Sequence, residues 1–169
     1  ALYRQFRLDE PWDSPNNIRM LSQMPKVYAA PQEQNQAGLG NTHYRGFSSP
    51  GAIFERKLVV RPGATDPHKG VKPADRFGLQ NLKDGSSNTI LVVEATDAVE
   101  WTKPDDLDAG PGTPFPALGG LWGDKKRVNV LFADGQVRFL RTDLAEPTWR
   151  ALITHSGGEP LPPGWDAQP

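Results

Sequence analysis

The stretch VNVLFADGQVRFL, residues 128–140, has the most regular alternation of apolar and polar residues in the chain. Two apolar runs flank the pair Asp134 and Gly135. An Asp-Gly pair between such runs is a strong signal for a β-hairpin, because both residues accept the positive φ that a two-residue type I′ turn requires. The stretch therefore predicts two antiparallel strands, with Asp134 and Gly135 as turn residues. The alternative is a hairpin that presents Asp134 as a functional carboxylate.

A two-residue turn also predicts the register of this hairpin. Phe132 then faces Val137, and Val130 faces Phe139, so that four apolar side chains share one face. We expect this face to pack on the core.

The segment Thr89–Ala95 is rich in β-branched residues and almost continuously apolar, which predicts a central strand. Asp84 and Gly85 begin the turn-forming stretch before it and are expected to be turn residues. Helical spacing is found towards the ends of the chain, in residues 1–24 and from Pro147 onward. Together these patterns predict an α+β fold with a small, mostly antiparallel sheet, short helices and long loops.

The composition is that of one small domain with extensive loops. The chain has 169 residues, of which 17 are Gly and 17 are Pro. We expect a single domain over residues 1–159 and a Pro-rich extended tail over residues 160–169. The net charge of -1 gives no basic surface for nucleic acid. Absence of cysteine excludes disulfides and thiolate metal sites.

No catalytic motif stands out. The histidines at positions 43, 68 and 155 lie in no recognisable nucleophile motif, and a hydrolase that uses carboxylates is supported only by the presence of acids. Residues 105–110, DDLDAG, partly match a calcium-binding loop but lack its full spacing and its closing Glu. A solvated acidic loop and a Ca²⁺ site are the two interpretations. We expect no other cofactor and no enzymatic activity.

Tryptophans are the remaining candidate interaction residues. Trp12 beside Asp13 and Trp101 near Lys103 have the composition of a sugar-stacking or partner-binding site, and Trp122 is a third candidate. The alternative is structural, with each indole sealing a corner of the core.

Five blocks, in this order, resemble the signature blocks of a large planctomycete family. The blocks are FRLDEPWDSPNN, MPKVYAAP, DGSSNTILVVEATDAVEWTKPDDL, LFADGQVRFL and WRALITHSGGE. The family is a domain of unknown function described as type II secretion pseudopilin G-like or as a major pilin. The resemblance spans nearly the whole chain. It implies no catalytic residues, and where the family often has Cys this chain has Ala30.

The resemblance implies a pilin-like globular head that follows a prepilin leader and a hydrophobic helix. The chain opens on ALYRQF, which looks like the end of a helix, and position 1 is not Met, so Ala1 is not expected to be the natural start. Residues 1–169 contain no such hydrophobic helix, so either the head is separated from it or this member has another architecture. The implied function is that of a non-enzymatic structural subunit of an extracellular or cell-surface pilin-like assembly, with itself or other subunits as partners. The implied location is extracellular, at the cell surface or periplasmic, without membrane contact by this segment.

One further expectation follows from this resemblance. If a helix is missing, Leu2, Tyr3 and Phe6 lie near its junction, and an apolar patch should be exposed there. The alternative function is a surface binding module that recognises a glycan or a protein through its tryptophans.

Overall fold

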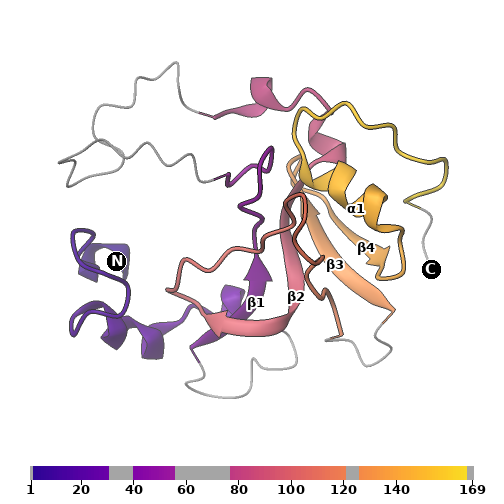
Figure 1. The fold of residues 1–169 in the computed structure, drawn as a ribbon. Helices are drawn as coiled ribbons and strands as arrows, with labels where there is room; N and C mark the ends of the chain where they lie inside the picture. The colour runs from indigo at the N-terminus through magenta and orange to yellow at the C-terminus, as the bar shows by residue number, and fades with distance from the viewer. Residues whose placement is uncertain (1, 31–39, 56–76, 121–125, 167–169) are drawn as a thin grey trace.

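A four-stranded antiparallel sheet is the centre of the fold (Figure 1). The computed structural model describes residues 2–30, 40–55, 77–120 and 126–166. The strands follow the order β1-β2-β3-β4 and are β1 (Asn41–Arg45), β2 (Ile90–Glu100), β3 (Arg127–Phe132) and β4 (Val137–Arg141). With helix α1 (Glu146–Ile153) and several 3₁₀ turns, this confirms the predicted α+β class.

Short 3₁₀ turns replace the helices predicted near the N-terminus: η1 (Leu2–Gln5), η2 (Asn17–Gln23) and η3 (Lys26–Tyr28). Two further 3₁₀ turns, η5 (Leu79–Asn81) and η6 (Ser86–Asn88), precede β2. Of the described helices, none is both long and apolar enough to cross a membrane. The N-terminal 3₁₀ turns and the described segment after α1 lie on opposite sides of the molecule (Figure 1).

The predicted hairpin is present, but its predicted register is wrong by one residue. Val130 pairs with Arg138, and Leu131 pairs with Val137. The loop has three residues, because the Gly135 N–H donates to the carbonyl oxygen of Phe132 at 2.9 Å and the Phe132 N–H donates to that of Gln136 at 2.9 Å. Gly135, at φ +84°, provides the left-handed residue that such a three-residue loop requires.

This register reverses the faces of β4. Val137 and Phe139 are 62% and 40% exposed instead of buried. Arg138 lies on the inner face, where its guanidinium carbon is 4.5 Å from the centre of the Phe132 ring. The guanidinium also donates to the Ser87 carbonyl oxygen at 3.0 Å and pairs with Asp134 at 3.2 Å.

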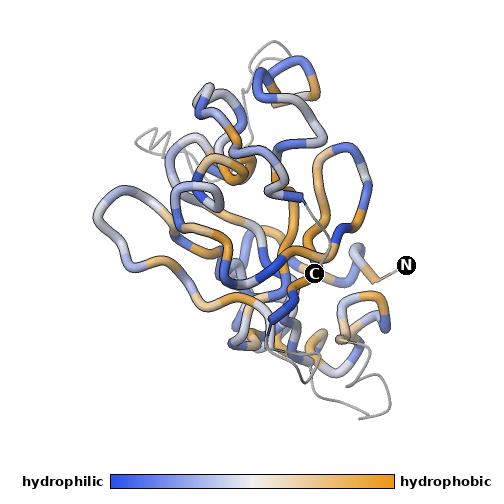
Figure 2. The backbone as a smooth tube through the Cα atoms, turned by 90° about the vertical axis from the view of Figure 1, so that its right-hand side faces the viewer, coloured by the Kyte–Doolittle hydropathy of each residue, from blue (hydrophilic) through white to orange (hydrophobic). Residues whose placement is uncertain are grey.

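Helix α1 covers the inner face of the sheet, and the core lies between them (Figure 1). The hydrophobic stretches of the strands run through the middle of the molecule, with hydrophilic stretches in the loops around them (Figure 2). The largest fully buried apolar side chains are those of Trp149, Phe132, Leu140, Leu152, Val93, Val128 and Val130.

Strand β2 bends sharply in its middle. Thr42 pairs with Val99, whereas Tyr44 pairs with Glu94, so residues 95–98 of β2 face only His43 of β1. Such an excess of residues on one strand bends it. The buried His43 ring accommodates the bend, with its Nδ1 atom 3.0 Å from the Ala95 carbonyl oxygen.

Glu94 lies where β3 separates from β2. The segment around Leu118 pairs with β2 beyond this point, through a bridge to Ala95. The Glu94 carboxylate is 1% exposed and accepts hydrogen bonds from the backbone N–H of Asn129 at 3.0 Å and from its side-chain amide at 2.9 Å. The Glu94 carboxylate thus links β2 to β3 where the two strands diverge.

The C-terminal residues follow the core rather than leaving it. Leu161 and Trp165, within the predicted extended tail, pack against the core. The Trp165 ring centre is 6.0 Å from that of Phe132, and the Arg138 guanidinium carbon is also 6.0 Å from the Trp165 ring. The segment after α1 therefore contacts the core through these two side chains.

Candidate functional site

Residues 6–17 form a compact hydrogen-bonded turn at the N-terminal side of the molecule. Asn17, which is 2% exposed, is at its centre. Its side-chain amide donates to the carbonyl oxygens of Arg7 and Pro11, both at 2.9 Å, and its amide oxygen accepts from the Arg7 backbone N–H at 2.9 Å. One buried amide thus satisfies backbone groups on both sides of the turn.

Glu10 ties the outer side of the same turn. Its carboxylate accepts hydrogen bonds from Asn16 at 2.9 Å, Ser14 at 2.8 Å and Arg7 at 3.0 Å. These bonds, with that from Asn16 the largest effect, lower the pKa of Glu10 from 4.5 to about 2. The polar residues of the block FRLDEPWDSPNN are therefore mainly bonded to one another.

Trp101 joins this N-terminal segment to the end of β2. Its indole N–H donates to the Leu21 carbonyl oxygen at 3.2 Å. The Tyr28 ring stacks on it at 5.6 Å between centres and 21° between planes, and Phe6 meets it edge-on at 5.9 Å. Because its own chain covers the indole in this way, the geometry favours the structural interpretation of Trp101 over sugar stacking.

The other predicted interaction residues do not gather around Trp101. Trp12 is half-buried, and Asp13 is exposed. Lys103 pairs with Asp105 at 2.8 Å, and this bond raises the pKa of Lys103. Trp122 lies outside the described residues.

The acidic loop predicted as a possible calcium site forms ion pairs with Lys and Arg side chains. Asp105 binds Lys103 through one carboxylate oxygen and Arg45 through the other, at 2.7 Å. Asp108 accepts from the Gly110 backbone N–H at 2.8 Å. Across residues 2–30, 40–55, 77–120 and 126–166, no group of three or more His, Asp or Glu side chains is placed to hold a metal ion.

The two Asp-Gly turns lie side by side at the opposite end of β2. The Asp134 backbone N–H donates to the Ser86 carbonyl oxygen at 3.1 Å, and that of Ala133 donates to the Thr89 carbonyl oxygen at 2.9 Å. Gly85, like Gly135, has a positive φ, of +91°.

Asp84 has a role that the sequence analysis did not predict. Its carboxylate accepts from the backbone N–H groups of Gly157 at 2.7 Å and Gly158 at 3.0 Å. It therefore ties the turn before β2 to the segment after α1. The two partners belong to two of the resembling blocks, DGSSNT and THSGGE, but nothing in their local sequence indicated that the blocks meet.

The two described histidines also bond to backbone. The His155 ring stacks edge-on against Phe77, with ring centres 4.9 Å apart, and its Nδ1 atom lies 3.2 Å from the Asn81 carbonyl oxygen. His43 bonds to the backbone of β2, as described above, and His68 lies outside the described residues.

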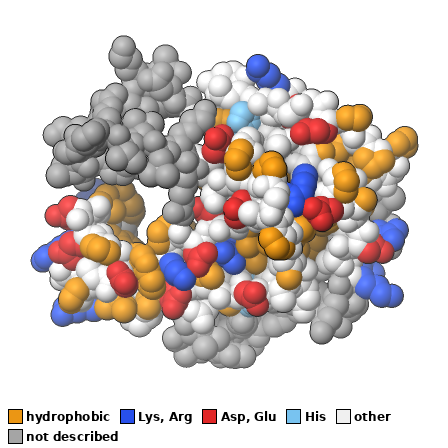
Figure 3. Space-filling view, in the orientation of Figure 1, with side chains coloured by type: hydrophobic (Ala, Val, Ile, Leu, Met, Phe, Trp, Pro, Cys, Tyr) orange, Lys and Arg blue, Asp and Glu red, His pale blue; other side chains and the backbone are white. Residues whose placement is uncertain are grey.

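Exposed apolar side chains are concentrated on the N-terminal segment. Half of the ten large hydrophobic residues found exposed in the described ranges belong to residues 2–28. We call this set the N-terminal apolar surface: Tyr3 (70% exposed), Leu8 (69%), Ile18 (44%), Val27 (74%) and Tyr28 (44%). Figure 3 shows hydrophobic side chains gathered over the lower left part of the molecule, where Figure 1 places this segment. Of the three residues expected at the helix junction, Tyr3 belongs to this set, whereas Leu2 and Phe6 are half-buried.

Comparison with known proteins gives one family match. A sequence model of the family described as "Protein of unknown function (DUF1559)" matches residues 1–120, which include the N-terminal segment, β1 and β2. No curated protein and no solved structure matches the chain.

Proposed function

The chain belongs to the family of proteins of unknown function DUF1559. Because the function of this family is unknown, we propose a role for the chain from the residues that it exposes. It is a non-enzymatic structural subunit of a pilin-like assembly outside the cytoplasm, at the cell surface or in the periplasm. Its partners are further copies of itself or other subunits of that assembly.

The observation that carries this proposal is the N-terminal apolar surface. Scattered exposed hydrophobic residues are normal, but their concentration on one segment is typical of an interaction site. The bonds around Asn17 and Glu10 and the packing on Trp101 hold this segment in shape. A partner would therefore meet a preformed surface and would not have to order a flexible segment, which lowers the cost of binding.

The arrangement of the acidic residues supports a structural rather than a catalytic role. Asp84 ties two distant segments together, Asp105 ties a loop to β1 through Arg45, and Asp134 pairs with Arg138 within the hairpin. Each carboxylate thus has a role in holding the backbone.

The proposal is tested by the oligomeric state of the chain. We expect the average mass in sedimentation velocity to rise with concentration, because the N-terminal apolar surface is buried between copies. The triple variant Tyr3→Ser, Leu8→Ser, Val27→Ser should stay monomeric at the same concentrations. Leu79→Ser is the matched control, since Leu79 is 72% exposed but lies outside the N-terminal segment, and it should behave as the wild type.

A wild-type chain that stays monomeric at all concentrations would count against self-assembly through this surface. Equal association of the wild type and the triple variant would place the contact elsewhere. Labelling with a membrane-impermeant reagent tests the location separately, in intact cells and in cells whose outer membrane has been permeabilised. Protection of the native protein in both until the inner membrane is broken would contradict it.

A further inference from the structure

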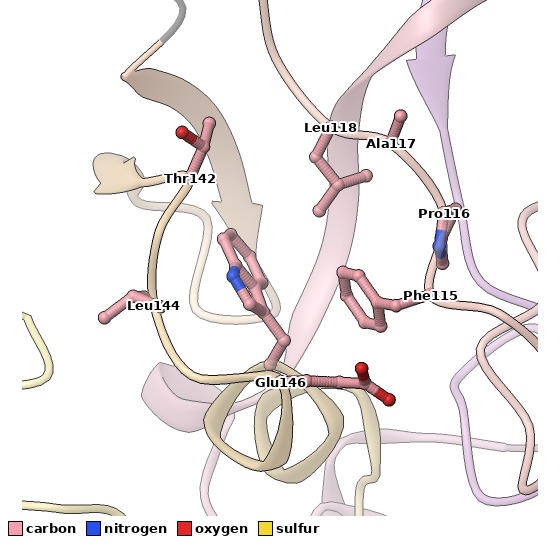
Figure 4. A pocket seen from close by; sticks show the side chains of 8 residues that line it. Phe115, Pro116, Ala117, Leu118, Thr142, Leu144 and Glu146 are labelled. Atoms are coloured by element: carbon pink, nitrogen blue, oxygen red, sulfur yellow. The ribbon is translucent and has the colours of Figure 1, made fainter.

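A pocket of about 190 Å³ lies beside the first turn of α1. Phe115 and Leu118 line it from the loop that follows β2, and Thr142 and Leu144 line it from the segment after β4 (Figure 4). Its volume is below the roughly 300–1,000 Å³ of sites for drug-sized ligands. It is therefore suited to one or two residues of a peptide rather than to a cofactor.

Trp149, which also lines the pocket, has an unused hydrogen-bond donor there. The residue is 2% exposed. Among the described residues, none accepts a hydrogen bond from its indole N–H. The N–H is not fully buried either, because Thr102 Oγ1 is the one fully buried side-chain nitrogen or oxygen without a hydrogen-bond partner in the described ranges. The small accessible part of Trp149 therefore includes a donor that opens to the pocket.

The charge at the rim of the pocket is already neutralised. The Glu146 carboxylate pairs with Arg150 at 2.6 Å, and the Arg150 guanidinium also donates to the carbonyl oxygens of Gly110 and Thr113. A charged ligand therefore gains little at this rim. The pocket favours a neutral, apolar occupant that brings a hydrogen-bond acceptor for the Trp149 N–H.

Proline in an extended chain fits these requirements. It has no backbone N–H, so its burial among apolar side chains leaves no donor unsatisfied. The carbonyl group that precedes it remains a good acceptor, and the extended polyproline conformation is already ordered before binding. Aromatic-lined grooves recognise such segments for these reasons.

We propose that this pocket binds an extended, proline-containing peptide segment of another protein. The proline ring lies against Phe115 and Leu118, and a peptide carbonyl oxygen accepts a hydrogen bond from the Trp149 indole N–H. The site is distinct from the N-terminal apolar surface and does not depend on the proposed assembly.

The test follows the indole N–H signals of the ¹⁵N-labelled chain by NMR. The Trp149 signal is assigned by its absence in Trp149→Phe. The probe is a capped peptide that contains Pro-Leu-Pro-Pro, the matched peptide contains Ala-Leu-Ala-Ala, and an oligosaccharide of glucose is the third ligand. We expect the proline peptide alone to cause a saturable downfield shift of the Trp149 signal.

Two variants keep the result interpretable. Trp149→Phe removes the donor but keeps an aromatic ring, so shifts of neighbouring amides should show affinity about fivefold weaker. Leu144→Lys places a charge in the pocket wall without changing a residue of the deep core, and it should abolish binding. Leu79→Ser, at a remote exposed position, should bind as the wild type.

Three results would overturn the proposal. The first is an unchanged Trp149 signal at the highest soluble peptide concentration. The second is a saturable shift with the oligosaccharide but not with the proline peptide, which would make the pocket a sugar site. The third is equal binding by the wild type and Leu144→Lys, which would place the peptide elsewhere.

Discussion

At the scale of single residues, acidic side chains bind backbone and neighbouring polar groups. Glu94 links β2 to β3 where the two strands diverge, and Asp84 holds the two glycines after α1. For Glu10 this arrangement predicts a pH-dependent stability of the turn, because three side chains donate hydrogen bonds to its carboxylate.

The pKa of Glu10 is about 2 in the folded chain and 4.5 without its partners. A depressed carboxylate pKa stabilises the folded segment above the unfolded pKa, and this contribution is lost as the pH falls through the folded value. We therefore expect the turn of residues 6–17 to loosen between pH 4.5 and about 2. The side-chain amide signals of the buried Asn17 in ¹⁵N NMR spectra should broaden or move towards random-coil positions over this range.

Glu10→Gln should show part of this loosening already at neutral pH, with little further change on acidification. Asp9→Asn, at the exposed neighbouring carboxyl, is the matched control and should follow the wild type. An identical pH profile in the wild type and in Glu10→Gln would show that Glu10 does not control the turn.

At the scale of elements, the hairpin shows how far local sequence can predict this fold. The two strands and the turn were predictable because alternation and an Asp-Gly pair are local signals. The register was not, because the same pair suits a two-residue and a three-residue loop. The backbone N–H groups of Ala133 and Asp134 bond to the neighbouring turn before β2, and this contact between distant segments favours the longer loop.

The same limit applies to the candidate site residues. The Asp-Gly pairs were predicted as turn residues, and both lie in turns. The bond between Asp84 and Gly157 could not be predicted, because it joins positions 73 residues apart. The helical spacing near the N-terminus also gave a wrong prediction of α-helix. There the side chain of the buried Asn17 bonds to backbone carbonyl groups and holds the segment in an irregular turn.

The conformation of the three-residue loop predicts how substitutions of Gly135 change the stability of the chain. Its φ of +84° lies in the left-handed region, and a Cβ atom added there would meet nothing within 4 Å. Gly135→Ala should therefore destabilise the chain through backbone strain alone, by about 1–2 kcal/mol. Gly135→Asn should cost less, because Asn tolerates this region better. Urea denaturation measures both, and equal stability of the wild type and Gly135→Ala would contradict this account of the loop.

At the scale of the whole molecule, β2 connects two differently built halves. The first half of β2 pairs with β3, beside the core that α1 covers. Trp101 follows the other end of β2 and contacts the N-terminal segment. The match to DUF1559 confirms the expected membership of a family of unknown function, and the matched residues include the N-terminal half and all of β2. The N-terminal segment thus meets the sheet at an aromatic cluster around Trp101, at the end of a bent strand.

Trp101→Ala should therefore detach the N-terminal segment without unfolding the sheet. The variant loses the stacking of Tyr28, the edge contact of Phe6 and the hydrogen bond to Leu21 at one position. Limited trypsin digestion should then cut faster within residues 2–30, which contain Arg and Lys, whereas the hairpin of β3 and β4 stays protected. Trp165→Ala is the matched control at the other side of the molecule, and it should leave cleavage within residues 2–30 at the wild-type rate. Uniformly faster digestion of the whole Trp101→Ala chain would instead mean that the two halves unfold as one unit.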